Sequence, residues 1–149
     1  MHRQLICYLL LSLLIVPCVL SQKRAIRPAK EFVTRQALVI GNADYAYAGR
    51  LRNPVNDAKA IGSTLKELGF EVRVITDANR RKMETAIRQF GKDLRGQSSA
   101  GLFYFAGHGM QIEGENYLLP TDINPSNEFD VTYDAVPVGK LLGLSLIHI

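Results

Sequence analysis

The sequence predicts an α/β protein with a mostly parallel sheet and helices on both faces. Short apolar runs typical of strands alternate along the chain with segments whose apolar residues recur at helical spacing. The order strand, helix, strand, helix, strand requires right-handed crossovers, so we expect a parallel sheet with the strand order 2-1-3. The composition agrees, because 47% hydrophobic and 21% charged residues are typical of a globular domain.

The first half of the domain contains a buried strand, a helix and a second strand. Residues 37–40 form a short apolar run followed by glycine, as expected of a buried strand. Asn53 caps a helix with Pro54 in its first turn, and apolar residues follow at helical spacing as far as Leu68. Residues 70–74 alternate between apolar and charged side chains, which predicts a second strand, half exposed at the sheet edge.

The second half begins with another helix and strand. Either Asp77 or Asn79 caps a helix with one apolar face. Residues 102–106 are apolar on both faces, which predicts a third, central strand. We then expect a hairpin of two short strands, a loop rich in proline, asparagine and aspartate, and the start of a third helix. The hairpin strands are assigned to residues 110–112 and 117–119, and the helix to residues 136–144.

The N-terminal segment, residues 1–21, resembles a secretory signal peptide. Arg3 precedes an almost unbroken apolar run from Leu5 to Leu20, which is shorter than the about 20 residues of a membrane span. We expect cleavage after Ser21, a secreted or periplasmic location, and a basic linker over residues 22–34. An uncleaved anchor is the alternative, and only it would place the protein at a membrane. Both cysteines of the sequence precede this cleavage site.

Several classes of function are excluded by the residues themselves. Lysine and arginine are scattered among acidic residues despite the net charge of +4, so we expect no nucleic-acid partner. The sequence contains no phosphate-binding loop, dinucleotide fingerprint or nucleophile elbow. His2 lies in the signal peptide and His148 among the last residues, which leaves His108 alone in the domain. Catalytic zinc normally needs three protein ligands, so we expect no metal or cofactor.

The predicted third strand is followed by Gly107-His108-Gly109. Open α/β sheets bind ligands beyond the carboxyl ends of the strands where the order reverses, here between the first and third strands. A histidine between two glycines at this place is suited to act as a general base or acid, and the Gly109 N–H is free to face a ligand. A turn histidine that only caps the strand is the simpler alternative, and its position favours the catalytic role.

Asp57 lies in the first turn of the first predicted helix. The helix dipole explains an acidic residue there, since the interaction stabilises a helix by about 0.3–1 kcal/mol. A carboxylate that receives a basic substrate side chain fits the same position. The residues alone leave the two interpretations equal.

Taken together, residues 37–122 resemble the large-subunit half, or p20 domain, of the caspase-like cysteine peptidases of family C14, specifically the bacterial metacaspase or orthocaspase branch. The matching segments are Ala37-Leu38-Val39-Ile40-Gly41-Asn42, Leu51-Arg52-Asn53-Pro54-Val55-Asn56-Asp57-Ala58, Leu68-Gly69-Phe70, Phe103-Tyr104-Phe105-Ala106-Gly107-His108-Gly109 and Gly114-Glu115-Asn116-Tyr117-Leu118-Leu119-Pro120-Thr121-Asp122. The resemblance implies a caspase-like three-layer sandwich over residues 35–144. It implies that His108 is the base and proton donor for a cysteine thiolate, and that the Gly109 N–H helps to bind the oxyanion.

The resemblance also implies a polypeptide substrate cut after arginine or lysine. Asp57 matches an acidic residue of the metacaspase substrate pocket. Animal caspases instead use an arginine of the neighbouring loop to receive aspartate; Leu51 falls near that position and Arg52 is one residue away, so acidic specificity stays open. Calcium activation, familiar among metacaspases, cannot be read from the sequence, because its acidic residues fit a solvated loop as well as a metal site. These residues are Asp122, Glu128, Asp130 and Asp134.

The nucleophile of the resembling family is missing. Its Asp-Ala-Cys motif lies about 50 residues after the histidine, whereas this sequence ends at Ile149 and has no cysteine after Cys18. We therefore expect an incomplete domain, inactive as printed, whose fourth strand and cysteine lie outside the chain, with residues 145–149 as a non-native tail. Two functions remain: a cysteine endopeptidase with a Cys/His dyad, and a caspase-like pseudoenzyme that acts as a binding or scaffold module.

Overall fold

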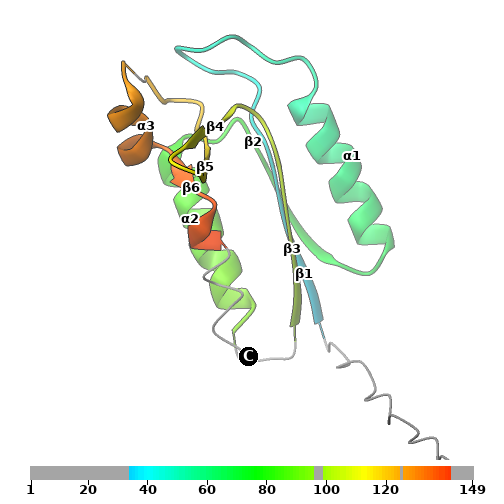
Figure 1. The fold of residues 1–149 in the computed structure, drawn as a ribbon. Coiled ribbons are helices and arrows are strands. Elements are labelled where there is room, and N and C mark those ends of the chain that lie inside the picture. The colour runs from blue at the N-terminus through cyan, green and yellow to red at the C-terminus, as the bar shows by residue number, and fades with distance from the viewer. Residues whose placement is uncertain (1–33, 96–98, 125, 142–149) are drawn as a thin grey trace, which may run out of the picture.

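The computed structural model describes residues 34–95, 99–124 and 126–141, which form two sheets, three helices and the start of a further helix at Gly139 (Figure 1). The first sheet is parallel with the order β2-β1-β3, as predicted, and the second is antiparallel with the order β4-β5-β6. The first sheet and its helices consist of β1 (Thr34–Gly41), α1 (Pro54–Glu67), β2 (Glu71–Thr76), α2 (Arg80–Asp93) and β3 (Ser99–Ala106). They are followed by β4 (Gly109–Ile112), β5 (Glu115–Leu118), α3 (Glu128–Asp134) and β6 (Val136–Pro137).

The parallel sheet lies between α1 on one face and α2 on the other (Figure 1), so the predicted arrangement of three layers is confirmed. Alternate residues of β1 point to opposite layers, because successive side chains of a strand face opposite sides of the sheet. Ala37 and Val39 pack on α1, where Ala58 and Leu65 are buried against them.

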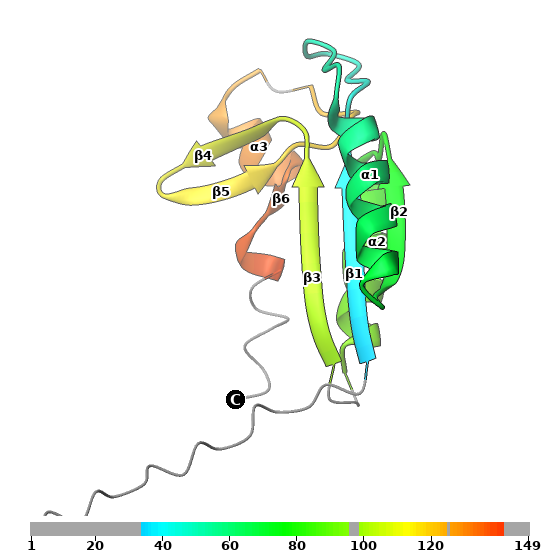
Figure 2. The same ribbon diagram turned by 90° about the vertical axis from the view of Figure 1, so that its right-hand side faces the viewer.

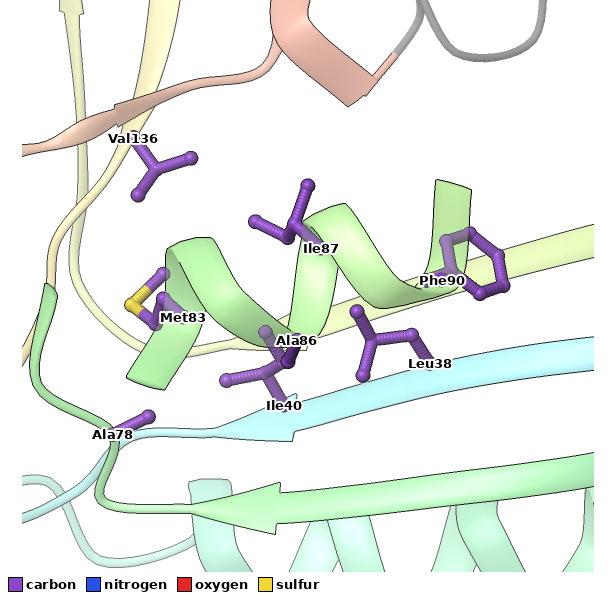
Figure 3. Packing of buried hydrophobic residues seen from close by; sticks show 8 residues of the cluster. All are labelled: Leu38, Ile40, Ala78, Met83, Ala86, Ile87, Phe90 and Val136. Atoms are coloured by element: carbon purple, nitrogen blue, oxygen red, sulfur yellow. The ribbon is translucent and has the colours of Figure 1, made fainter. Parts of the chain in front are cut away.

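The opposite face of β1 builds the larger core with α2 (Figure 3). Leu38 and Ile40 are completely buried under α2. The apolar side of this helix consists of Met83, Ile87 and Phe90. Full burial of each such side chain contributes about 1.5–3 kcal/mol. This core fixes the direction in which β1 ends, and therefore the position of the loop that follows it.

The hairpin of β4 and β5 turns through Glu113 and Gly114, both with positive φ, as a two-residue hairpin turn requires. Figure 2 shows it projecting sideways from the carboxyl end of β3. A third cluster attaches it to the loop after β1, because buried Tyr45 and Leu119 pack with Ile123 and Val131. The hairpin and the loop after β1 therefore form one packed unit.

Two predictions about the last elements were wrong. Residues 136 and 137, predicted as helix, pair with β5 as strand β6, and the helix begins only at Gly139. The reason is that the Val136 side chain is buried in the α2 core while its backbone pairs with Leu118. The polar loop before it contains α3, which starts with a capping box between Asn127 and Asp130.

Three other expectations are resolved in detail. Asn79, not Asp77, caps α2, since its side chain accepts a hydrogen bond from the Lys82 N–H at 2.9 Å. The first strand begins at Thr34, inside the predicted linker. Within the described ranges β3 pairs only with β1, so β1 is the central strand and β3 borders an open edge.

The predicted signal peptide, most of the linker and the tail at residues 145–149 lie outside the described residues. In the part of the chain that the structure describes, no helix is long and apolar enough to cross a membrane.

Candidate active site

The carboxyl ends of β1 and β3 lie side by side, because Gly41 pairs with Ala106 at the end of the sheet. The Asn42 N–H continues this pairing by donating to the Ala106 carbonyl at 2.8 Å. The loop after β1 and the Gly107-His108-Gly109 segment after β3 are therefore neighbours, as the predicted strand order requires.

His108 is held at three points by the loop after β1. Its Nε2 lies 2.8 Å from the Gly49 carbonyl oxygen, and its backbone N–H donates to the Tyr45 hydroxyl at 2.8 Å. The Tyr45 ring lies against the imidazole with 4.6 Å between centroids and a tilt of 59°. A carbonyl only accepts hydrogen bonds, so Nε2 carries the proton and Nδ1 of the neutral ring has a free lone pair. Nδ1 is thus the atom that can accept a proton.

Gly107 makes the approach of Tyr45 feasible. A Cβ at this position would lie 2.6 Å from the Tyr45 hydroxyl oxygen and 2.7 Å from the Phe105 ring, closer than real Cβ contacts. The first glycine of the motif is therefore required by its neighbours.

The Gly109 N–H lies outside the ladder between β4 and β5. The Leu119 N–H donates to the His108 carbonyl at 3.0 Å, so these two residues form a hydrogen-bonded pair. Hydrogen-bonded and non-hydrogen-bonded pairs alternate along an antiparallel ladder. Gly109 and Leu118, the next pair, are therefore a non-hydrogen-bonded pair. The Gly109 N–H consequently points away from β5. The hairpin ladder therefore leaves this donor free.

Buried polar groups fix the loop after β1. The side chain of Asn42, fully buried, donates to the carbonyls of Ala78 and Leu119, both at 3.2 Å, and accepts from the Ala78 N–H at 2.9 Å. Asp77, with φ of 46°, accepts from the Ala43 and Asp44 N–H groups at 2.8 and 3.0 Å. Sequence reasoning missed both roles, although a polar residue directly after a buried strand was a signal for the first.

Burial raises the pKa of the Tyr45 phenol above its usual value, against the hydrogen bonds from His108 and Asn42, which lower it. The hydroxyl therefore keeps its proton at neutral pH. It donates that proton to the Leu119 carbonyl at 3.2 Å while accepting from His108.

An open pocket of about 610 Å³ lies beside the loop that contains Gly49. Asp57 does not line this pocket: it is exposed in the first turn of α1, and its N–H donates to the Asn53 carbonyl at 2.9 Å. The structure therefore places the two arginines of the loop, and not Asp57, at the pocket. The lining residues are Ala43, Arg50, Leu51, Arg52, Val55, Asn56 and Asp77.

Three of the four acidic residues weighed as a calcium site take other partners, and the side chain of the fourth, Glu128, lies outside the described part of the chain. The Asp122 carboxylate accepts from the Arg80 N–H at 2.9 Å, and Asp134 contacts the guanidinium of Arg80 at 2.7 Å. Asp130 accepts from the N–H groups of Ser126 and Asn127. Across the described residues, no three histidine, cysteine or carboxylate side chains gather as metal ligands would.

Comparison with known proteins identifies the family. Residues 34–137 match the model of the caspase domain, peptidase family C14, over more than half of the chain. An 86-residue stretch is 33% identical to the human mucosa-associated lymphoid tissue lymphoma translocation protein 1, and equally to its Mus musculus homolog. This stretch spans 58% of the chain but only 10% of either relative.

A solved structure supports the fold. The crystal structure of protein GSU0716 from Geobacter sulfurreducens superimposes with a TM-score of 0.57 at 20% identity, over 74% of this chain and 44% of that protein. The segment that matches the caspase-domain model, residues 34–137, includes β1, β3, the hairpin and His108, which are the parts that build the site. The chain therefore belongs to the caspase domain family, peptidase family C14.

Proposed function

We propose that this chain supplies the histidine half of a cysteine endopeptidase of the metacaspase or orthocaspase type, acting outside the cytoplasm after removal of residues 1–21. The observation that carries the proposal is the orientation of His108. Its Nε2 proton is engaged by the Gly49 carbonyl, so the lone pair of Nδ1 is available for a thiol, and the Gly109 N–H is free of the hairpin ladder.

In the proposed reaction Nδ1 of His108 takes the thiol proton of a cysteine and leaves a thiolate and an imidazolium. A free thiol has a pKa of about 8.5, which a neighbouring imidazolium lowers enough to supply nucleophile at neutral pH. The thiolate attacks the scissile carbonyl, and the new oxyanion is bound by backbone donors including the Gly109 N–H. Each donor of this kind contributes about 2.7–4 kcal/mol to the stabilisation of the transition state. His108 then protonates the leaving amine, and water releases the acyl group.

In this proposal the nucleophilic cysteine belongs to a segment other than the described residues, which contain none. The open edge of β3 is where a fourth parallel strand would bring it. The carboxyl end of such a strand would lie beside that of β3, and therefore beside His108.

For the substrate we propose arginyl or lysyl bonds, with Asp57, exposed in α1 next to the pocket residue Asn56, as the acidic residue that receives the basic side chain. The support is the family match of Asp57 and the carboxylate of Asp77 in the pocket. Arg50 and Arg52 line the same pocket and favour an acidic side chain instead, although Arg50 lies 3.9 Å from the carboxylate of Asp44, which weakens this effect. A peptide series separates the two specificities.

The second candidate is a caspase-like pseudoenzyme that binds or organises other proteins. Among the described residues the caspase domain is present and a cysteine is not, and a binding module needs only the first. The two candidates differ in one residue, that at the end of the fourth strand.

The deciding experiment recovers the complete reading frame from source DNA and assays its product on peptides that end in arginine, lysine or aspartate. His108→Ala should abolish cleavage, whereas Asn116→Ala, an exposed change in β5, should leave it intact. Loss of arginine and lysine cleavage in Asp57→Ala, with the fold retained, would assign the pocket. A reading frame without a cysteine after a fourth strand, and no cleavage, would establish the pseudoenzyme and refute the peptidase.

A further inference from the structure

We infer that Tyr45 is a positioning residue that sets the orientation of His108 by inserting its hydroxyl into the end of the β4–β5 ladder. The inference rests on the proposed function in one respect, namely that the orientation of His108 matters for proton transfer. The insertion itself is a structural claim that can be tested without activity.

The inserted hydroxyl replaces one hydrogen bond of the ladder. The Leu119 N–H donates to the His108 carbonyl at 3.0 Å, and a regular antiparallel pair would return a bond from the His108 N–H to the Leu119 carbonyl. Instead the His108 N–H donates to the Tyr45 hydroxyl at 2.8 Å, and this hydroxyl donates onward to the Leu119 carbonyl at 3.2 Å. The hydroxyl bridges the two groups as a water molecule would.

The bridge acts on the imidazole because Tyr45 and Gly49 belong to one loop. The backbone of His108 is bound at Tyr45, its ring face lies against the Tyr45 ring, and its Nε2 reaches the Gly49 carbonyl. Three contacts from one loop leave the ring little rotational freedom. They also keep the proton on Nε2 and the lone pair on Nδ1.

Two independent features preserve the bridge. Tyr45 is 6% exposed and packs in the cluster with Leu119 and Ile123, and burial keeps its phenol protonated. Gly107 has no side chain at the place where a Cβ would lie 2.6 Å from the hydroxyl oxygen. The packing of the Tyr45 ring fixes the hydroxyl in place, and the absence of a side chain at Gly107 leaves room for it.

A purely structural Tyr45 would act through the packing of its ring alone. Tyr45→Phe separates the two roles, because it retains the ring in the cluster and removes only the bridging oxygen. Tyr47→Phe is the matched control: it deletes the same atom from a side chain of the same loop that is 65% exposed.

The test uses NMR of the full chain labelled with nitrogen-15. In Tyr45→Phe we expect hydrogen exchange of the His108 amide to accelerate by about tenfold, the factor that corresponds to one hydrogen bond. We also expect the imidazole nitrogen shifts to move from the pure Nε2–H form toward a mixture of tautomers. Tyr47→Phe should change neither signal. Unchanged exchange and unchanged imidazole shifts in a folded Tyr45→Phe protein would overturn the inference.

A measurement on the unsubstituted protein covers the case in which Tyr45→Phe does not fold. The bridge predicts a slowly exchanging Tyr45 hydroxyl proton with a nuclear Overhauser effect to the His108 amide. Absence of this contact in a well-dispersed spectrum would equally refute the inference.

The complete enzyme separates the inference from the proposed function. If the peptidase is active, Tyr45→Phe should lower kcat by about tenfold with KM unchanged, since only the alignment of the base is altered. An unchanged kcat would refute the positioning role. An inactive complete protein with the NMR changes intact would refute the proposed function and leave the insertion of Tyr45 established.

Discussion

The buried Asn42 side chain should be a main support of the site, and Asn42→Ala tests this. The Asn42 amide joins the end of β1 to the segment before α2 and to the segment after β5 through three hydrogen bonds. The alanine variant leaves the Ala78 N–H without an acceptor in a buried place. The two carbonyls that lose a donor keep another, because Thr121 N–H also binds Ala78 and the Tyr45 hydroxyl also binds Leu119.

The expected loss follows from this difference between the three groups. An orphaned buried N–H costs about 1–3 kcal/mol, and each of the other two bonds contributes about 0.5–1.5 kcal/mol. We therefore expect Asn42→Ala to lower the free energy of unfolding by about 2–6 kcal/mol, a large part of a typical domain's stability.

Urea unfolding followed by circular dichroism measures the change, with Asn116→Ala as the control. Asn116 is exposed in β5, so its replacement should stay within about 0.5 kcal/mol of the parent protein. Asn42→Asp keeps an acceptor for the Ala78 N–H but turns a carboxylate oxygen toward two carbonyls, and should therefore not restore stability at neutral pH. An Asn42→Ala loss below about 1 kcal/mol would show that the three bonds do not support the fold as argued.

Three further outcomes follow from single contacts. Gly107→Ala should destabilise the protein by about 1–3 kcal/mol in thermal unfolding, because its Cβ collides with the Tyr45 hydroxyl; Gly49→Ala, with nothing within 4 Å, is the control that should be tolerated. Burial raises the pKa of Tyr45 in the folded state, so its contribution to stability is complete below the unfolded value of about 10 and is lost as the pH rises through the folded value. Unfolding titrations should show this alkaline loss, and Tyr45→Phe should reduce it. Asn127→Ala removes the cap of α3 and should lower the stability of that helix by about 1 kcal/mol, which speeds amide exchange there and leaves α2 unchanged. Unchanged exchange in α3 would contradict the role of the capping box.

The elements that could be predicted from the sequence are those whose apolar residues repeat regularly along the strand or helix. The strands and helices that build the parallel sheet have runs or faces of apolar residues long enough to be recognised. Helix α3 has seven residues, of which Val131 is buried, and strand β6 has two residues fixed by pairing with β5. Segments this short have no period of their own, and their structure is decided by contacts with elements distant in sequence.

The same reason limited the prediction of the site. His108 was recognisable from its two glycines and its place after a strand. The contacts that orient it are distant in sequence: Tyr45 lies 63 positions before His108, and Asn42 lies 77 positions before Leu119. No local pattern links residues so far apart. The role of Asp57 stays a prediction: its motif suggests a substrate-binding residue, and the structure leaves it exposed beside Asn56, which lines the pocket.

The geometry also weighs against a histidine that only caps its strand. Capping needs the backbone or the ring of His108 to satisfy groups at the end of β3. Its Nε2 instead bonds to Gly49, in the loop that continues into the pocket, and its N–H is bound by a hydroxyl from that same loop. A side chain held by the pocket loop, with one ring nitrogen engaged and the other available, supports the proposal that His108 transfers protons. A capping histidine needs no hydroxyl inserted between the backbones of His108 and Leu119, and it needs no Gly109 N–H directed away from β5. An oxyanion that forms beside the base does need such a free N–H.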